Sequence, residues 1–123
     1  MSTENRVHKE VRDAGVGNVL FLTIDATNTP YYLKVGEQVV IAVTALSDAA
    51  AIIYLPSVAE AAGRFYSFVA PTGATAGDIS IYTRESGAEY TGGGDDGDLD
   101  ADNDYVVLYS DGVAWRTIKD GVA

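Results

Sequence analysis

The sequence predicts an all-β domain: an antiparallel β-sandwich, jelly-roll-like, with one short helix and an extended N-terminal arm. Three observations support this fold class. Short runs rich in β-branched and aromatic residues recur at intervals of roughly 8 to 12 residues. Clusters of Gly, Pro, Asn and Asp separate these runs and are typical of turns. The chain has 123 residues, 47% of them hydrophobic, which is sufficient for one buried core and hence for one domain.

The first predicted strands follow Gly17. The run Asn18–Asp25, NVLFLTID, is β-branched and aromatic, and it ends at the turn cluster ATNTP. Pro30 fixes its own φ and suits the start of an edge strand, YYLK. The run Gln38–Leu46, QVVIAVTAL, is apolar on both faces for part of its length. We therefore expect this strand to lie under another layer.

A short helix is predicted in the middle of the chain. The strand Ala51–Leu55 ends at Pro56, and Ser57 then precedes Glu60 by the spacing of a capping box. Gly63 stands where a glycine commonly ends a helix. The segment SVAEAA is thus predicted to form a helix of barely more than one turn, which only packing can hold.

Further strands are predicted at Phe65–Ala70 and Asp78–Thr83, and a weaker one in SGAEYTGGG. The runs YVVLYS and VAWRTI are predicted to pair as a hairpin across Asp111 and Gly112, a strong turn signal. We expect Trp115 to pack behind this turn. The organisation is therefore an N-terminal arm, residues 1–15, followed by a single β-rich domain, residues 16–123.

The composition excludes several classes of function. The chain has no Cys, so it has no disulfide and no thiolate chemistry. Its formal net charge is −10, which disfavours nucleic-acid binding because that affinity depends on cations. We find neither the apolar core of a signal peptide nor a membrane-spanning run of about 18 apolar residues. We expect a soluble protein made in a cytoplasm.

The excess of acids lies outside the arm. Residues 1–13 carry three cations and three acids, whereas the remainder carries five cations and fifteen acids. A near-neutral arm on an acidic body suits an arm that docks onto a partner, although a frayed terminus has the same composition. The arm residues that we single out for such docking are Arg6, His8, Lys9 and Arg12.

Catalysis is not expected. His8 is the single histidine, and the chain has no GxSxG sequence, so nothing supports a hydrolase triad. The run Gly92–Gly94 lacks the Lys-Ser/Thr of a phosphate-binding loop and is followed by acids. Eight Tyr and Trp115 offer the material for a sugar-stacking platform. Aromatic residues at strand spacing are more often core residues and cross-strand pairs.

An acidic loop follows the glycines and is the strongest candidate for metal chemistry. Closely spaced carboxylates provide the hard oxygen ligands that Ca²⁺ requires, with Asp98, Asp100 and Asp102 as weak candidates. Counted from Asp98, Asn103 replaces the required Gly of an EF-hand and Tyr109 replaces its Glu. We therefore expect a solvated acidic loop, with no metal and no cofactor. The loop's carboxylates are Asp95, Asp96, Asp98, Asp100, Asp102 and Asp104.

Two segments carry a resemblance to a known group of proteins. The first has a strand, Leu55-Pro56, a short turn from Ala59 to Gly63, and a strand with Tyr66; the second ends in Ser110-Asp111-Gly112 with Trp115. This pattern, over roughly Ile52 to Ile118, resembles a module of tailed-bacteriophage virion proteins, both head decoration proteins and tail fibres. Its matching residues are turn and core residues. They are Leu55, Pro56, Ser57, Glu60, Gly63, Asp111, Gly112 and Trp115.

The resemblance implies a non-enzymatic capsid decoration (cement) protein on the exterior of a phage head. It also implies two partners, the major capsid protein and further copies of the chain, with a trimer favoured, and neither nucleic acid nor membrane. Two alternatives stay open. The first is a tail fibre or tail-tip component, and the second is a calcium- or carbohydrate-binding module.

Overall fold

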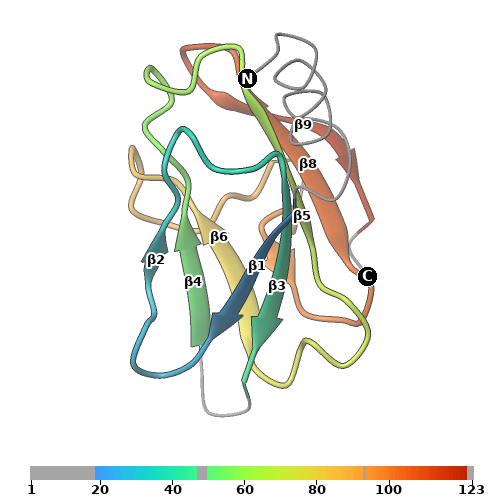
Figure 1. Cartoon of the computed structure of the whole chain (residues 1–123). Coiled ribbons are helices and arrows are strands. Elements are labelled where there is room, and N and C mark those ends of the chain that lie inside the picture. Colours follow the sequence, from blue (N-terminus) through green and yellow to red (C-terminus); the bar gives the residue numbers. More distant parts are fainter. Residues whose placement is uncertain (1–18, 47–49, 93, 122–123) are drawn as a thin grey trace, which may run out of the picture.

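The computed structural model describes residues 19–46, 50–92 and 94–121, and these form an all-β fold with no helix (Figure 1). The predicted arm, with Arg6, His8, Lys9 and Arg12, lies outside the described residues. No helix long and apolar enough to cross a bilayer occurs within the described ranges. The strands are β1 (Val19–Ile24), β2 (Tyr31–Tyr32), β3 (Val40–Ala45), β4 (Ala50–Tyr54), β5 (Phe65–Val69), β6 (Asp78–Tyr82), β7 (Asp98–Leu99), β8 (Tyr105–Ser110) and β9 (Trp115–Asp120).

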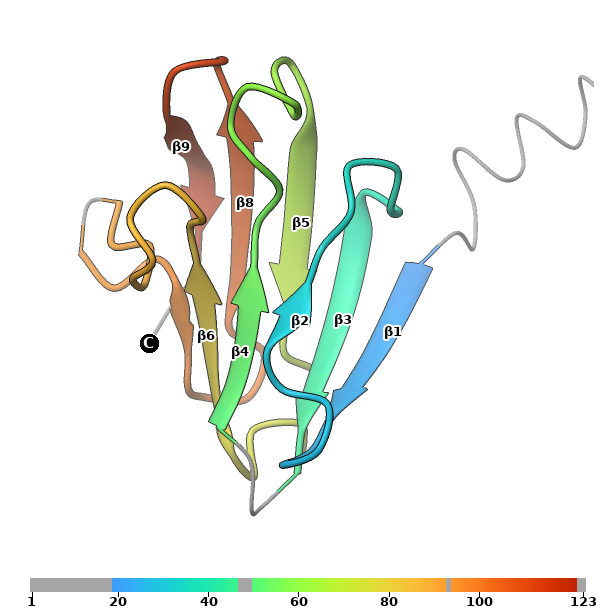
Figure 2. The ribbon, with the colours of Figure 1, turned by 90° about the vertical axis from the view of Figure 1, so that its left-hand side faces the viewer.

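The strands make two sheets that face each other. Sheet A has the order β1-β3-β5-β8-β9, and sheet B has the order β2-β4-β6-β7. Figure 2 looks onto sheet B, with the strands of sheet A behind it. From β1 to β6 the chain alternates between the sheets, so it winds around the core like a flattened coil. Neighbouring turns of this coil therefore pair in parallel, as β1 with β3 and β4 with β6.

The prediction of an all-β sandwich is confirmed, but the prediction that its strands are antiparallel is wrong for the coil. Antiparallel pairs join β5 to β8, β6 to β7 and β8 to β9, and the other four pairs are parallel. A jelly roll is built from antiparallel strands, and the described strands do not form one. The reason is that loops such as residues 25–30 carry the chain across to the other sheet. A hairpin turn would instead have returned the chain to the same sheet, antiparallel to the strand before it.

The predicted helix at Ser57–Ala62 is also wrong. The N–H of Ala61 donates to the carbonyl of Ser57 at 3.0 Å, which closes one isolated turn. The N–H of Val58 donates to Glu85 Oε2 at 3.0 Å, a partner from outside the segment. A single turn gains too few hydrogen bonds to offset the free energy of helix nucleation. Backbone groups of the segment bond to other parts of the fold instead. Gly63 does adopt a positive φ, +82°, where the turn ends.

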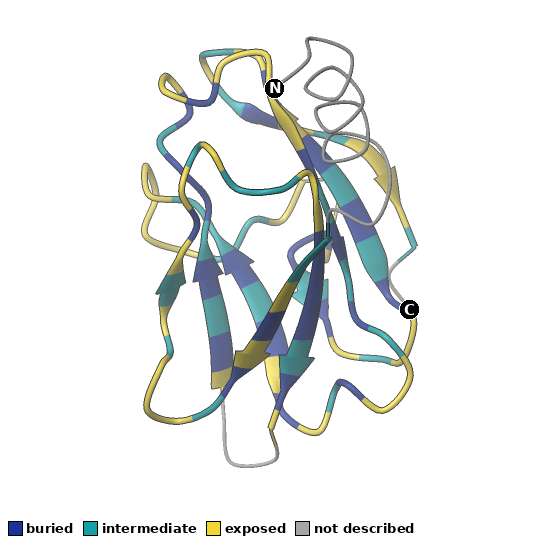
Figure 3. Cartoon of the chain, in the orientation of Figure 1, coloured by how far each residue is buried: buried dark blue, intermediate teal, exposed yellow. Residues whose placement is uncertain are grey.

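The core fills the space between the sheets, because alternate residues of each strand point inward. Figure 3 shows this alternation as dark and lighter bands along β4, β6 and β8. The most deeply buried large side chains include Tyr66 and Phe68 of β5, Ile41 of β3 and Ile53 of β4. Leu99 of the short β7 is fully buried as well. The inward face of every one of these strands is thus committed to packing, and function is left to outer faces, edges and loops.

A row of tyrosines crosses the outer face of sheet B. The register places Tyr32 beside Tyr54 and Tyr54 beside Tyr82. The rings of Tyr32 and Tyr54 stack at 4.9 Å with 7° between their planes, and Tyr82 meets Tyr54 edge-on at 5.4 Å. The guanidinium of Arg84 lies 5.5 Å from the Tyr32 ring centre. The three rings pack against one another as cross-strand pairs. They do not lie side by side in one plane, as the rings of a flat sugar-binding platform would.

Candidate functional site

The outer face of sheet A is the first candidate site. Since successive side chains of a strand alternate, the residues that do not face the core project outward. We call their apolar and aromatic members the Phe21 face. They are Val19, Phe21, Val40, Ala42, Phe65, Val69, Tyr105, Val107 and Tyr109.

The Phe21 face is uncharged, and several of its large side chains are well exposed. Phe21 is 77% exposed, Phe65 is 48% exposed and Tyr109 is 37% exposed. No residue of β1, β3, β5 or β8 is charged, although the chain as a whole carries a net charge of −10. The register sets the cations Arg116 and Lys119 of β9 beside Tyr109 and Val107. An exposed sheet face on which apolar residues predominate, here with Ser67 between Val40 and Val107, is typical of a protein–protein contact.

The Phe21 face was missed by sequence reasoning, although a signal was available. In NVLFLTI both phases of the alternation are apolar: Leu20, Leu22 and Ile24 are one phase, and Val19 and Phe21 are the other. The first phase enters the core. A second apolar phase on a strand that is open to solvent indicates a surface that something else covers.

The described residues of the acidic loop do not group the weak calcium candidates, Asp98, Asp100 and Asp102, into a metal site. Asp98 lies in β7 opposite Ser80, whereas Asp102 Oδ1 accepts a hydrogen bond from Thr75 Oγ1 at 3.1 Å. Asp104 is buried, and its carboxylate accepts the N–H of Ala101 at 3.0 Å. Within the described residues, no three His, Cys, Asp or Glu side chains are grouped so that they could hold a metal. The loop's carboxylates are instead used locally or face solvent.

Asp98 supplies a pH dependence that can be measured. Burial, and then repulsion by Asp100 and Glu89, raises the pKa of Asp98 from 3.8 to about 6. The folded state therefore binds a proton more tightly than the unfolded chain, so this group's effect is to lower the stability of the fold as the pH rises from about 4 to about 6. We expect Asp98→Asn to raise the melting temperature at about pH 7.5 and to change it little at about pH 4.

Thermal unfolding of the two proteins at both pH values tests this prediction. Asp120→Asn, at the exposed end of β9, is the matched control and should leave the difference between the two pH values unchanged. Equal gains from Asp98→Asn at both pH values would contradict a titrating role. Added calcium should not reproduce the effect of the substitution, because no three carboxylates converge among the described residues.

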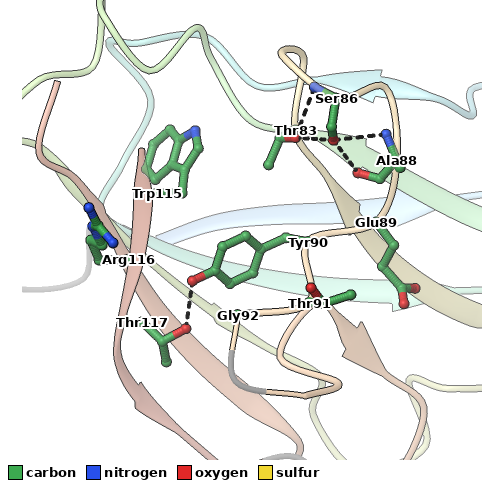
Figure 4. Close-up of a pocket in the computed structure, with 10 residues that line it drawn as sticks. All are labelled: Thr83, Ser86, Ala88, Glu89, Tyr90, Thr91, Gly92, Trp115, Arg116 and Thr117. Atoms are coloured by element: carbon green, nitrogen blue, oxygen red, sulfur yellow. Dashed lines mark hydrogen bonds between the residues drawn. The ribbon is translucent and has the colours of Figure 1, made fainter. Parts of the chain in front are cut away.

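The second candidate site is a hollow between β9 and the loop that follows β6, which we call the Tyr90–Trp115 pocket (Figure 4). Its volume is about 620 Å³. Segments far apart in the sequence form it, since one wall comes from residues 83–92 and the other from residues 115–117. The lining residues are Thr83, Ser86, Ala88, Glu89, Tyr90, Thr91, Gly92, Trp115, Arg116 and Thr117.

A chain of hydroxyl groups fixes one side of this pocket. Thr117 Oγ1 donates to Asp96 Oδ2 at 2.6 Å, and Asp96 is 7% exposed. Since the proton of Thr117 is used there, the Tyr90 hydroxyl is the donor in its 2.8 Å contact with Thr117 Oγ1. Gly92 lies against this chain, where a Cβ atom would come within 2.2 Å of Asp96 Oδ2. The Tyr90 ring is therefore held in one position.

The hairpin of β8 and β9 forms the other side. Asp111 Oδ1 accepts the N–H groups of Val113 and Ala114, both at 2.8 Å, and Asp111 Oδ2 accepts Arg116 Nε at 2.9 Å. These bonds lower the pKa of Asp111 to about 2. Gly112 has a φ of +91°, which L side chains rarely adopt. Trp115 opens β9 beside Ser110, 6% exposed, with its ring 6.0 Å from Tyr66.

The residues of the sequence motif lie around this hairpin and under it. Leu55 and Pro56 are buried, Ser57 is half-buried and Glu60 is exposed. The N–H of Gly63 donates to the carbonyl of Ser110 at 2.8 Å, which joins the two motif segments. Sequence reasoning expected Trp115 to pack behind the hairpin turn and did not single out Tyr90 or Thr117, because no local pattern relates residues so far apart.

Comparisons of the chain with family models, with curated proteins and with solved structures find no match. The described residues therefore define the class by structure alone. The described residues form an all-β, two-sheet domain, in which β1, β3, β5 and β8 of sheet A carry no charged residue and a pocket lies beside β9.

Proposed function

We propose that this chain is a structural protein of a bacteriophage virion, a decoration protein that binds the outer surface of the head and stabilises it. The Phe21 face is the observation that carries the proposal. A decoration protein needs no active site. It needs a surface that leaves water when the protein meets the capsid, and burial of side chains the size of Phe21 and Phe65 contributes several kcal/mol.

The distribution of charge supports the same proposal. The Phe21 face contains no acid, whereas β6 and β7 begin with Asp78 and Asp98, and most remaining carboxylates lie in loops. A protein that docks through sheet A would keep its acidic groups in solvent. That arrangement keeps particles soluble and apart, because like charges repel.

The proposal includes the partners that the sequence resemblance implies. These are the major capsid protein and other copies of the chain, arranged as a symmetric oligomer, with a trimer favoured. The arm of residues 1–15 would reach across the capsid protein, and Arg6, Lys9 and Arg12 would pair with its acids, with His8 beside them. The protein would lie on the capsid exterior, act without catalysis and bind neither nucleic acid nor membrane.

The test is cosedimentation of the purified protein with phage heads that lack it. Phe21→Asp should weaken binding by at least about a hundredfold, since an unpaired charge buried in an interface costs about 3 kcal/mol or more. The matched control is Val113→Asp, because Val113 is 83% exposed but lies in the hairpin loop, away from sheet A's outer face. It should bind as the unaltered protein does.

Two results would overturn the proposal. One is a Phe21→Asp protein that is folded by circular dichroism and still saturates heads. The other is immunogold label confined to the tail of intact virions, which would favour the tail-fibre alternative.

A further inference from the structure

The Tyr90–Trp115 pocket has the construction of a small-molecule site, and its volume of about 620 Å³ falls in the usual range for one. Tyr90 does not depend on a ligand for its position. Its O–H donates to Thr117, its N–H donates to the carbonyl of Ile81 at 2.7 Å, and its carbonyl lies against Gly97. A ligand that binds against this ring therefore loses little affinity to ordering of the protein.

Trp115 adds an unsatisfied donor beside the pocket. Its side chain is almost fully buried, and within the described residues its indole N–H has no acceptor. Figure 4 shows the nitrogen-bearing edge of the ring turned toward Thr83 and Ser86, away from Arg116. A buried donor without a partner costs about 1–3 kcal/mol. A ligand oxygen that accepted this N–H would recover that cost.

The charges around the pocket select against ionic ligands. Arg116 stands on one side, held by Asp111 at 2.9 Å, and Glu89 stands on the other. An anion would meet Glu89 and the strongly acidic chain, whereas a small cation would meet the guanidinium. Planar charged groups and hydroxyls are, however, good partners for a neutral ligand that carries many hydroxyl groups. Thr91 lines the same wall and contributes one more hydroxyl.

We propose that the Tyr90–Trp115 pocket binds a neutral saccharide unit. The apolar face of a sugar ring would lie against the Tyr90 ring, and its hydroxyls would bond to Glu89, Arg116 and Thr91. The pocket lies beside the edge strand β9, where Arg116 borders Tyr109 of the Phe21 face. The saccharide site does not depend on the proposed function, and either can fail alone.

Trp115 is the chain's single tryptophan and lies at the pocket, so its fluorescence reports on occupancy directly. The purified full chain is titrated with glucose, galactose, N-acetylglucosamine, lactose and maltose at millimolar concentrations. At least one neutral sugar should give a saturable change in Trp115 emission. Glu89→Ala and Tyr90→Leu should each weaken that binding by about tenfold, equivalent to about 1.4 kcal/mol.

The matched control is Tyr105→Leu, the same change at a tyrosine on the outer face of sheet A. It should leave the affinity unchanged. Glu89→Ala keeps the test sharp if Tyr90→Leu fails to fold, because the Glu89 side chain is only half-buried at the pocket rim. Silence across all neutral sugars would overturn the inference. So would a response to sialic acid or tetramethylammonium alone, or equal weakening by Tyr105→Leu.

Discussion

Gly97→Ala is expected to destabilise the fold by about 3 kcal/mol or more, because backbone atoms occupy the space that a side chain would need. A Cβ atom at this position would lie 2.3 Å from the carbonyl oxygen of Tyr90 and 2.9 Å from that of Ile81. Neither oxygen can retreat cheaply. The Ile81 carbonyl accepts the N–H of Tyr90, and the Ile81 N–H donates to the carbonyl of Gly97, both at 2.7 Å.

Urea unfolding followed by Trp115 fluorescence measures this effect. The matched control is Gly94→Ala in the same loop, since a Cβ atom there meets nothing within 4 Å and the residue does not have a positive φ. Gly94→Ala should shift the free energy of unfolding by less than about 0.5 kcal/mol. Equal stabilities for the two variants would mean that the edge of sheet B adapts around Gly97. Because Gly97 supports Tyr90, its variant should also weaken the saccharide site.

Local sequence patterns were sufficient for the longer strands, but not for the short β7 or for which strands pair. YYLK after Pro30 was predicted as an edge strand, and β2 is the edge of sheet B. Gln38–Leu46 was predicted to lie under another layer; the inward phase of β3 is buried, but Val40 of its outer phase is 38% exposed. The alternation of apolar residues along a strand, and its composition, predict which side chains are buried. They do not predict which strands pair, so the parallel coil could not be predicted.

The candidate sites divide in the same way. The Phe21 face can be predicted from the sequence. Both alternating sets of side chains in the strand are apolar, and one core can bury only one of the two sets. The Tyr90–Trp115 pocket cannot be predicted from the sequence pattern. Tyr90 lies in the loop after β6 of sheet B and Thr117 lies in β9 of sheet A, so the two residues meet only in the folded chain. SGAEYTGGG was predicted as a weak strand, yet Glu89 makes only an isolated bridge to Tyr82. The segment is therefore not part of a regular sheet, and Glu89 and Tyr90 line the pocket.

Ser110→Ala is expected to cost about 2–4 kcal/mol, because it removes one hydroxyl that bonds to two backbone groups, one of them buried. Ser110 is fully buried, and its Oγ donates to the carbonyl of Val58 and accepts the N–H of Gly112 at 3.1 Å. Its backbone also receives the N–H of Gly63 and donates to the carbonyl of Arg64. Loss of the hydroxyl would leave the buried carbonyl of Val58 and the half-buried N–H of Gly112 without this partner.

The matched control is Ser67→Ala, at a half-buried position on the outer face of β5, where we expect a change below about 0.5 kcal/mol. Thermal and urea unfolding of both variants give the comparison. Ser110 is where the Leu-Pro-turn segment and the Ser-Asp-Gly hairpin meet, so these motif residues act together to hold the fold. If Ser110→Ala were as stable as Ser67→Ala, that account of the motif would fail, and a role for it at the surface would have to be sought instead.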